Sequence, residues 1–162
     1  MYHWIVFLHV LATFAYMMAH GAAANVAFKL RSETSRERIA ALLDLSSMAY
    51  NFMYLALLVV LAAGIVLGFL GEWWGRVWIW LVLLLIVGKL FAMFMMGASS
   101  FSQLRKTAGL PYFEGMKPHP ALSPGSPEEI AARAASIKPI PIALVGFGGL
   151  VLMLWLMMFK PF

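Results

Sequence analysis

The sequence contains no cysteine and little charge. Asp, Glu, Lys and Arg together make up only 12% of its 162 residues. The absence of cysteine excludes disulfides, thiolate metal sites, covalent c-type haem and cysteine-ligated iron–sulfur clusters. A metal or haem bound by this chain would therefore need histidine, methionine or lysine as its ligand. Signatures of soluble enzymes are also absent, because the chain has no glycine-rich phosphate loop, no nucleophile elbow and no HExxH motif.

The chain instead has long apolar runs. Hydrophobic residues make up 63% of it and the mean hydropathy is +0.86, whereas soluble domains are roughly 45–50% apolar. Four runs, over residues 4–28, 48–70, 77–98 and 139–159, reach the roughly 20 residues that cross a bilayer core. They predict an all-α integral membrane protein, a single up-and-down four-helix bundle in the lipid bilayer. The GFGG run at residues 146–149 predicts close approach of a neighbouring helix.

The basic residues indicate the orientation of this bundle. Nine of the twelve lie in the loops that follow the first and third spans: Lys29, Arg31, Arg36, Arg38, Arg105, Lys106, Lys117, Arg133 and Lys138. Loops rich in Lys and Arg face the cytoplasm. We therefore expect both termini outside and a multi-pass protein of the inner (plasma) membrane. The net charge of +5 then has an explanation that involves no nucleic acid.

The only sizeable segment outside the spans covers residues 102–138. Its first half, LPYFEGMKPHPALSPG, is rich in proline and glycine and is predicted to be irregular. Its second half predicts a short cytoplasmic helix over residues 127–136, in which Ser126 and Glu129 form a capping box. Earlier in the chain, Ser35 is predicted to cap a helix that continues into the second span.

Lys89 is the ionisable residue nearest to the centre of a span. It follows Trp78 and Trp80 by eleven and nine residues, or roughly 14–17 Å of helix. A charge at the bilayer centre costs about 2.5–3.5 kcal/mol on insertion scales, so such a residue is a candidate functional residue by default. We expect Lys89 to face the bundle interior, to have a partner and to act in catalysis or cofactor binding. The alternative is a structural contact with carbonyl groups or a buried water.

Two histidines fall within the first span. His9 and His20 are eleven residues apart, which places them within roughly 20° of one helix face but about 16 Å apart along the axis. One metal or haem iron therefore cannot bind both of them. Each is a candidate cofactor or metal ligand with partners of its own. The alternative for each is a hydrogen bond between helices.

The methionines suggest a further hypothesis, that the protein binds copper. Met17 precedes His20 by three residues, and Met96 ends a methionine-rich run in the third span. Thioether and imidazole ligands suit Cu(I), so these residues with His9 or His20 would make a copper-handling membrane protein. The alternative is that the methionines are flexible packing residues.

Three short segments resemble a known family. They are FLHVL with His9, VGKLF with Lys89 and the C-terminal KPF of residues 160–162. They are similar to segments of the four-helix membrane protoporphyrinogen oxidases and, more loosely, of the copper-resistance D-like membrane proteins. The resemblance implies haem b, with His9 as a haem ligand and Lys89 near the porphyrin or its propionates. It also implies a haem-dependent membrane oxidoreductase that acts in electron transport or porphyrin chemistry.

The same sequence is also compatible with a different class of function. A small membrane bundle can be a non-catalytic accessory subunit that packs against a larger respiratory, photosynthetic or transport complex. A homo-oligomer is equally compatible with the sequence, which indicates neither a substrate nor an electron acceptor.

Overall fold

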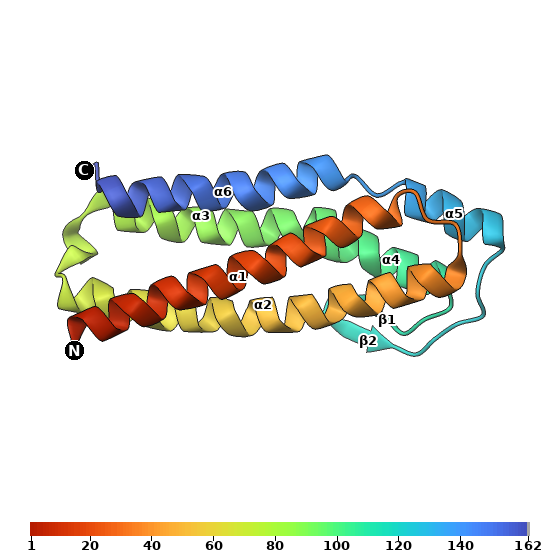
Figure 1. Cartoon of the computed structure of the whole chain (residues 1–162), viewed down its shortest axis with the longest axis horizontal. Coiled ribbons are helices and arrows are strands. Elements are labelled where there is room, and N and C mark those ends of the chain that lie inside the picture. The colour runs from red at the N-terminus through yellow and green to blue at the C-terminus, as the bar shows by residue number, and fades with distance from the viewer. Residues whose placement is uncertain (162) are drawn as a thin grey trace.

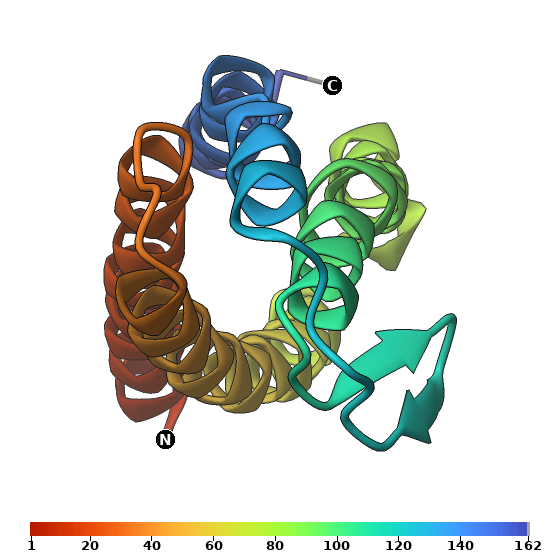
Figure 2. The same ribbon diagram turned by 90° about the vertical axis from the view of Figure 1, so that its right-hand side faces the viewer.

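The chain has four long helices, and they surround a common centre (Figure 2). The computed structural model describes residues 1–161, so Phe162 of the KPF segment lies outside the described residues. Helix α1 covers Tyr2–Leu30, α2 covers Arg36–Leu70 and α6 covers Pro139–Phe159. The third long helix completes the ring, and the order around the centre is α1, α2, α3 and α6.

The third long helix has three parts. Helix α3 (Val77–Met93) continues through a π-helical turn, η2 (Phe94–Ala98), into α4 (Ser99–Thr107). It ends nine residues beyond the predicted span, so the loop begins later than expected. Together with α1, α2 and α6 it makes four helices that are long and apolar enough to cross a membrane. The predicted all-α membrane bundle is thereby confirmed in its class.

The two ends of the bundle differ in composition. The N-terminus, the end of α6 and η1 (Trp73–Gly75) lie at one end, here termed the tryptophan end because it carries Trp4, Trp73, Trp74, Trp78 and Trp80 (Figure 1). The opposite end is termed the basic end and carries the nine loop Lys and Arg residues. Its loop contains β1 (Tyr112–Glu114), β2 (Lys117–His119) and α5 (Pro127–Ala135).

The segment predicted to be irregular contains an antiparallel hairpin. Phe113 lies opposite Pro118, and Glu114 lies opposite Lys117. The prediction was wrong here because a two-stranded hairpin consists only of edge strands, where proline is tolerated. Gly115 allows the turn, since its φ of 61° is in the left-handed region.

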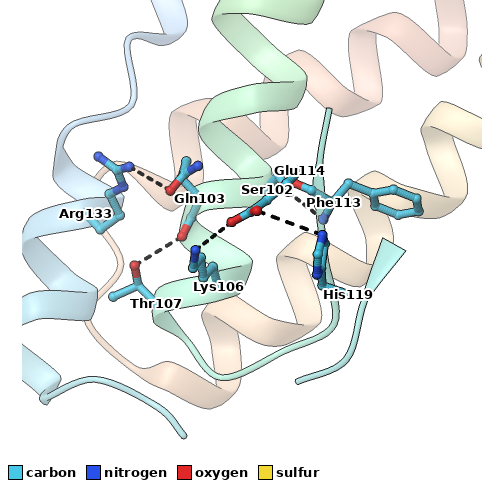
Figure 3. Close-up of polar contacts among 8 residues, drawn as sticks. All are labelled: Ser102, Gln103, Lys106, Thr107, Phe113, Glu114, His119 and Arg133. Atoms are coloured by element: carbon cyan, nitrogen blue, oxygen red, sulfur yellow. Dashed lines mark hydrogen bonds and ion pairs between the residues drawn. The ribbon is translucent and has the colours of Figure 1, made fainter. Parts of the chain in front are cut away.

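Polar contacts hold the hairpin on α4 (Figure 3). The Lys106 ammonium lies 2.6 Å from a Glu114 carboxylate oxygen, and the Phe113 amide donates to the Ser102 hydroxyl at 2.8 Å. His119 stacks on Tyr112 and lies 3.9 Å from the other Glu114 oxygen. The hydrogen bond from Lys106 lowers the pKa of Glu114 below its usual value.

Both predicted caps are present. The Ser126 hydroxyl accepts from the Glu129 amide and the Glu129 carboxylate accepts from the Ser126 amide, which forms the capping box of α5. The Ser35 hydroxyl accepts from the Arg38 amide at the start of α2. These contacts satisfy amides that have no partner within a helix.

Each end of the bundle interior is filled by an apolar cluster. The basic-end cluster consists of Val26, Ala27, Leu30, Ile39, Leu43, Phe101, Leu104, Ala108, Ile130, Ala134, Ile137 and Ile142. The tryptophan-end cluster consists of Trp78, Ile79, Val82, Met153 and Leu156. Helix α1 packs chiefly along α2, and α3 along α6. By contrast, α2 and α3 meet mainly at their ends, through η1 and α4.

Candidate functional site

A buried polar centre lies between the two apolar clusters. It consists of Tyr16 and His20 on α1 and Lys89 on α3, here termed the central cluster. The three side chains are 6%, 1% and 7% exposed. The Tyr16 and His20 rings stack with centroids 6.3 Å apart, and the Lys89 ammonium lies 4.8 Å from the Tyr16 ring centroid. The prediction that Lys89 faces the interior is confirmed, and its partner is an aromatic ring face.

Two glycines of α6 make room for this cluster. A β-carbon at Gly146 would overlap the His20 ring nitrogen Nε2, and one at Gly149 would lie 3.3 Å from Lys89 Cδ. Phe147, between them in sequence, meets the His20 ring edge-on at 5.1 Å. The glycine run therefore allows close approach of neighbouring helices, as predicted. The side chains that approach it are His20 and Lys89.

The central cluster is incompletely hydrogen-bonded. Within residues 1–161, neither Lys89 Nζ nor His20 Nε2 has a hydrogen-bond partner, although both atoms are buried. Burial of a polar group without such a partner costs free energy, and burial of a charge costs more. The contact of Lys89 with Tyr16 offsets part of this cost, since a cation over an aromatic face is attracted to it. The remaining donor capacity is available to a ligand.

A small cavity adjoins the central cluster. It measures about 20 Å³ and is lined by Tyr16, His20, Tyr50, Met53, Tyr54, Leu90, Met93, Phe94 and Ala98. This is room for one water, which needs roughly 10–15 Å³. A haem does not fit this cavity, since sites for larger ligands measure about 300–1,000 Å³. The Nε2 atom of His20 also faces Gly146 rather than open space.

The π-helical turn η2 shapes this cavity. Phe94 and Ala98 both line it, and a β-carbon at Gly97 would lie 3.4 Å from the Tyr50 hydroxyl. Such turns are rare and frequently occur at functional sites. Sequence reasoning missed η2, Tyr16 and Tyr50, for which the only signal was the presence of tyrosine within apolar spans.

His9 lies apart from the central cluster. Its ring nitrogen Nδ1 is 2.9 Å from the Val60 carbonyl oxygen of α2. The carbonyl can only accept, so Nδ1 carries the proton and Nε2 is the acceptor nitrogen. Gly64 permits this approach, because a β-carbon there would lie 3.3 Å from His9 Cε1. The structure thus gives His9 the interhelical hydrogen bond and brings His20, rather than His9, to Lys89.

The methionines of the copper hypothesis are dispersed. Met96 packs against the basic-end cluster, Met17 is half-buried on α1, and Met93 rather than either of them lines the cavity beside His20. Over residues 1–161, no group of three His, Asp or Glu side chains is placed to hold a metal ion. A copper site of methionine and histidine stays a prediction.

Comparisons with known proteins assign no family to this fold. A scan against protein-family models and searches of curated proteins and of solved structures found no match to the chain. Membership of the membrane protoporphyrinogen oxidases, suggested by three short segments, stays a prediction. The residues that can carry a function are therefore those of the central cluster and His9.

Proposed function

We propose that the chain acts in redox or porphyrin chemistry within the membrane, with the central cluster as its acid–base centre. The observation that carries this proposal is the buried Lys89 ammonium, for which the described part of the chain supplies no hydrogen-bond partner. Intramembrane ionisable groups are costly and typically mark ligand sites or proton relays. Lys89 supplies a positive charge or a proton to a ligand oxygen, and the buried His20 ring packs beside it in the same cluster. The Tyr16 ring positions the ammonium.

The same proposal includes an orientation. The basic end faces the cytoplasm and both termini face outward, in the inner (plasma) membrane. The nine loop Lys and Arg residues support it, because positive residues next to spans are retained on the cytoplasmic side.

Replacement of Lys89 by methionine distinguishes a chemical role from a structural one. If the ammonium serves a ligand, Lys89→Met removes a charge without a hydrogen-bond partner from the interior and raises the stability of the protein. The thermal midpoint of the protein in lipid nanodiscs measures this change. Lys89→Arg, which keeps the charge, is the control and should give no increase. A lower midpoint for Lys89→Met would show that the amine supports the fold, and the assignment would be overturned.

His9 carries a second proposal, which is haem b. Histidines that bind a metal usually donate their other ring N–H to a carbonyl or carboxylate, which fixes the ring and its tautomer. His9 already has this arrangement through Val60, and Nε2 is then the ring nitrogen that can bind a metal. His20 does not, because its Nε2 faces Gly146. A haem held by His9 would supply one-electron chemistry.

The visible absorption spectrum tests the haem proposal. Protein expressed under haem-replete conditions should show a Soret band, which His9→Ala removes and His20→Ala retains. His3→Ala is the control for a histidine at the start of α1. A wild-type protein without a Soret band would exclude haem b and would leave the acid–base role of Lys89 to its own test.

A further inference from the structure

A second cavity lies at the tryptophan end of the bundle and is here termed the end cavity. It measures about 570 Å³, whereas sites for small molecules measure about 300–1,000 Å³. The turn that joins α2 to α3 forms one part of its lining, and the end of α6 forms the other (Figure 1). The lining residues are 71–73, Arg76, Trp78, Lys160 and Pro161.

Two tryptophan rings hold a cation at the end cavity. The Lys160 ammonium lies 4.1 Å from the Trp73 ring centroid and 5.8 Å from that of Trp78. A cation at such a distance is attracted to the ring face. Gly71 lets the Trp73 ring take this position, because a β-carbon at residue 71 would overlap the ring. The packing of the turn therefore fixes the place of the Lys160 ammonium.

Two lining residues have an uncommon backbone conformation. Glu72 and Lys160 have φ values of 54° and 45°, and within residues 1–161 no other residue except glycine has a positive φ. Glycine adopts this region readily, whereas other residues seldom do. Both positions nevertheless carry a charged residue, and both residues line the end cavity. Uncommon backbone conformations cluster at sites that bind ligands.

The charges around the end cavity define the chemistry of a ligand. The charged lining residues are Glu72, Arg76 and Lys160. All three are exposed, and in the described part of the chain none of them forms an ion pair. Guanidinium and ammonium groups are the usual protein ligands of phosphate. The three side chains together leave one net positive charge, which matches the single negative charge of a phosphate diester. A phosphate monoester carries more, about −1.5 to −2.

The end cavity lies at the depth of the lipid headgroups. Trp4 and Trp80, at the same end of the bundle, are 74% and 56% exposed. Tryptophans of membrane proteins concentrate at the interface between the membrane and water. Phospholipid headgroups occupy this interface, so their phosphate diesters are the most abundant phosphate at this depth.

We propose that the end cavity binds the phosphate diester of a membrane phospholipid between Arg76 and Lys160. The Trp73 and Trp78 rings position the Lys160 ammonium, and Glu72 limits the positive charge to that which a diester needs. The acyl chains of the lipid remain in the hydrocarbon layer. This site is independent of the proposed acid–base centre, because none of its lining residues belongs to the central cluster.

Native mass spectrometry tests the site with one lipid. The protein in dodecyl maltoside, a detergent without phosphate, is titrated with phosphatidylglycerol, and the dissociation constant of the first bound lipid is measured. Arg76→Gln combined with Lys160→Gln should weaken this binding at least several-fold, because both phosphate ligands are lost. The matched control is Lys29→Gln combined with Arg31→Gln, which removes two exposed cations at the basic end and should leave the binding unchanged. Equal binding by the two double variants would overturn the site.

A variant with the opposite effect separates loss of the site from misfolding. Glu72→Gln raises the positive charge of the end cavity and should tighten the binding of phosphatidylglycerol several-fold. Glu37→Gln, at an exposed position in the first turn of α2 at the basic end, changes the net charge equally and should have no effect. Unchanged or weaker binding by Glu72→Gln would overturn the site.

Two further compounds separate a lipid from other sources of phosphate. Diacylglycerol with the same acyl chains lacks the phosphate diester and should bind at least several-fold more weakly than phosphatidylglycerol. Glycerophosphoglycerol, which is the headgroup without acyl chains, should not displace the lipid at equal concentration. Equally tight binding of diacylglycerol, or displacement by the free headgroup, would overturn the assignment of a phospholipid.

Discussion

The fit between His20 and α6 depends on one missing methyl group. Gly146 faces the His20 ring so closely that a β-carbon would overlap Nε2, whereas Gly148, two residues further along the same helix, faces open space. The two glycines therefore have the same helix propensity but opposite tolerance of a side chain. This makes them a matched pair for mutation.

Gly146→Ala and Gly148→Ala should shift stability in opposite directions. Overpacking against His20 should cost about 1–3 kcal/mol at residue 146. Alanine at residue 148 should gain up to about 1 kcal/mol, because it restricts the helix backbone without meeting a neighbour. Thermal unfolding in nanodiscs measures both. Equal midpoints for the two variants would contradict the close packing of His20 on Gly146.

At the residue level, the sequence identified the polar side chains but not their partners. Lys89, His9 and His20 stand out because polar groups are rare in spans, and helical periodicity predicts that both histidines lie near one face of their helix. Periodicity could not reveal that α1 crosses the bundle, so that His9 meets α2 and His20 meets α6 (Figure 1). Tyr16 escaped notice because tyrosine in an apolar span has the same pattern as a packing residue.

Among the elements, η2 differs from the helices that flank it. A π-helical turn accommodates one residue more than the α-helical ladder would. Removal of one residue from η2 should therefore restore a continuous α-helix without rotating α4 against α2 and α5. Removal of a residue from the regular part of α3 rotates everything beyond it by about 100°.

Deletion of Met95 should consequently be tolerated far better than deletion of Leu84. Both residues are exposed and apolar, at 56% and 67%. We expect the Met95 deletion to keep the helix content and most of the thermal stability, and the Leu84 deletion to lose the folded protein. Circular dichroism and thermal melting compare them. Similar losses in both proteins would show that η2 is not a one-residue insertion.

The docking of the hairpin on α4 should depend on pH. The pKa of Glu114 is lowered by the hydrogen bond from Lys106, so the contact stabilises the docked hairpin at pH values above the ordinary carboxyl pKa. That stabilisation is lost as the pH falls through the lowered pKa. His119, 3.9 Å from the same carboxylate, loses its attraction when Glu114 becomes neutral. Acid should therefore loosen the hairpin from α4.

A spin label at the hairpin turn reports this change. Met116→Cys places it at a 91% exposed position in a chain with no other cysteine. Label mobility should rise on acidification, and Glu114→Gln should give high mobility at every pH. A label whose mobility stays pH-dependent in the Glu114→Gln background would assign the effect to another group.

At the element level, the start of a helix was predicted correctly where the local sequence contains a helix-start signal. Pro139 begins α6 and the predicted limits of this helix match the structure. Ser35 and Ser126 mark the other two starts that were found. The end of α4 was missed because a π-helical turn preserves the apolar pattern. The hairpin was missed because contacts with α4 stabilise its short strands, and those contacts cannot be seen in the local sequence.

For the molecule as a whole, the proposed orientation can be tested on intact cells. Gly75→Cys lies at the tryptophan end, and Ser123→Cys lies in the loop at the basic end. If the basic end is cytoplasmic, a membrane-impermeant maleimide should modify Gly75→Cys and spare Ser123→Cys until the membrane is opened. Permeabilised cells, in which the maleimide reaches both sides of the membrane, control for the reactivity of the two cysteines. The reverse pattern would place both termini inside.

The length of α2 has a consequence for the whole molecule. Its 35 residues extend about 52 Å, against roughly 30 Å of hydrocarbon, so the basic end projects into water. The basic-end cluster is therefore assembled by expulsion of water, whereas the spans associate without that driving force. The protein thus combines an apolar core that forms in water with a helix bundle that forms in lipid. Urea and low temperature should therefore weaken the packing of the basic-end cluster and leave the packing of the spans in place.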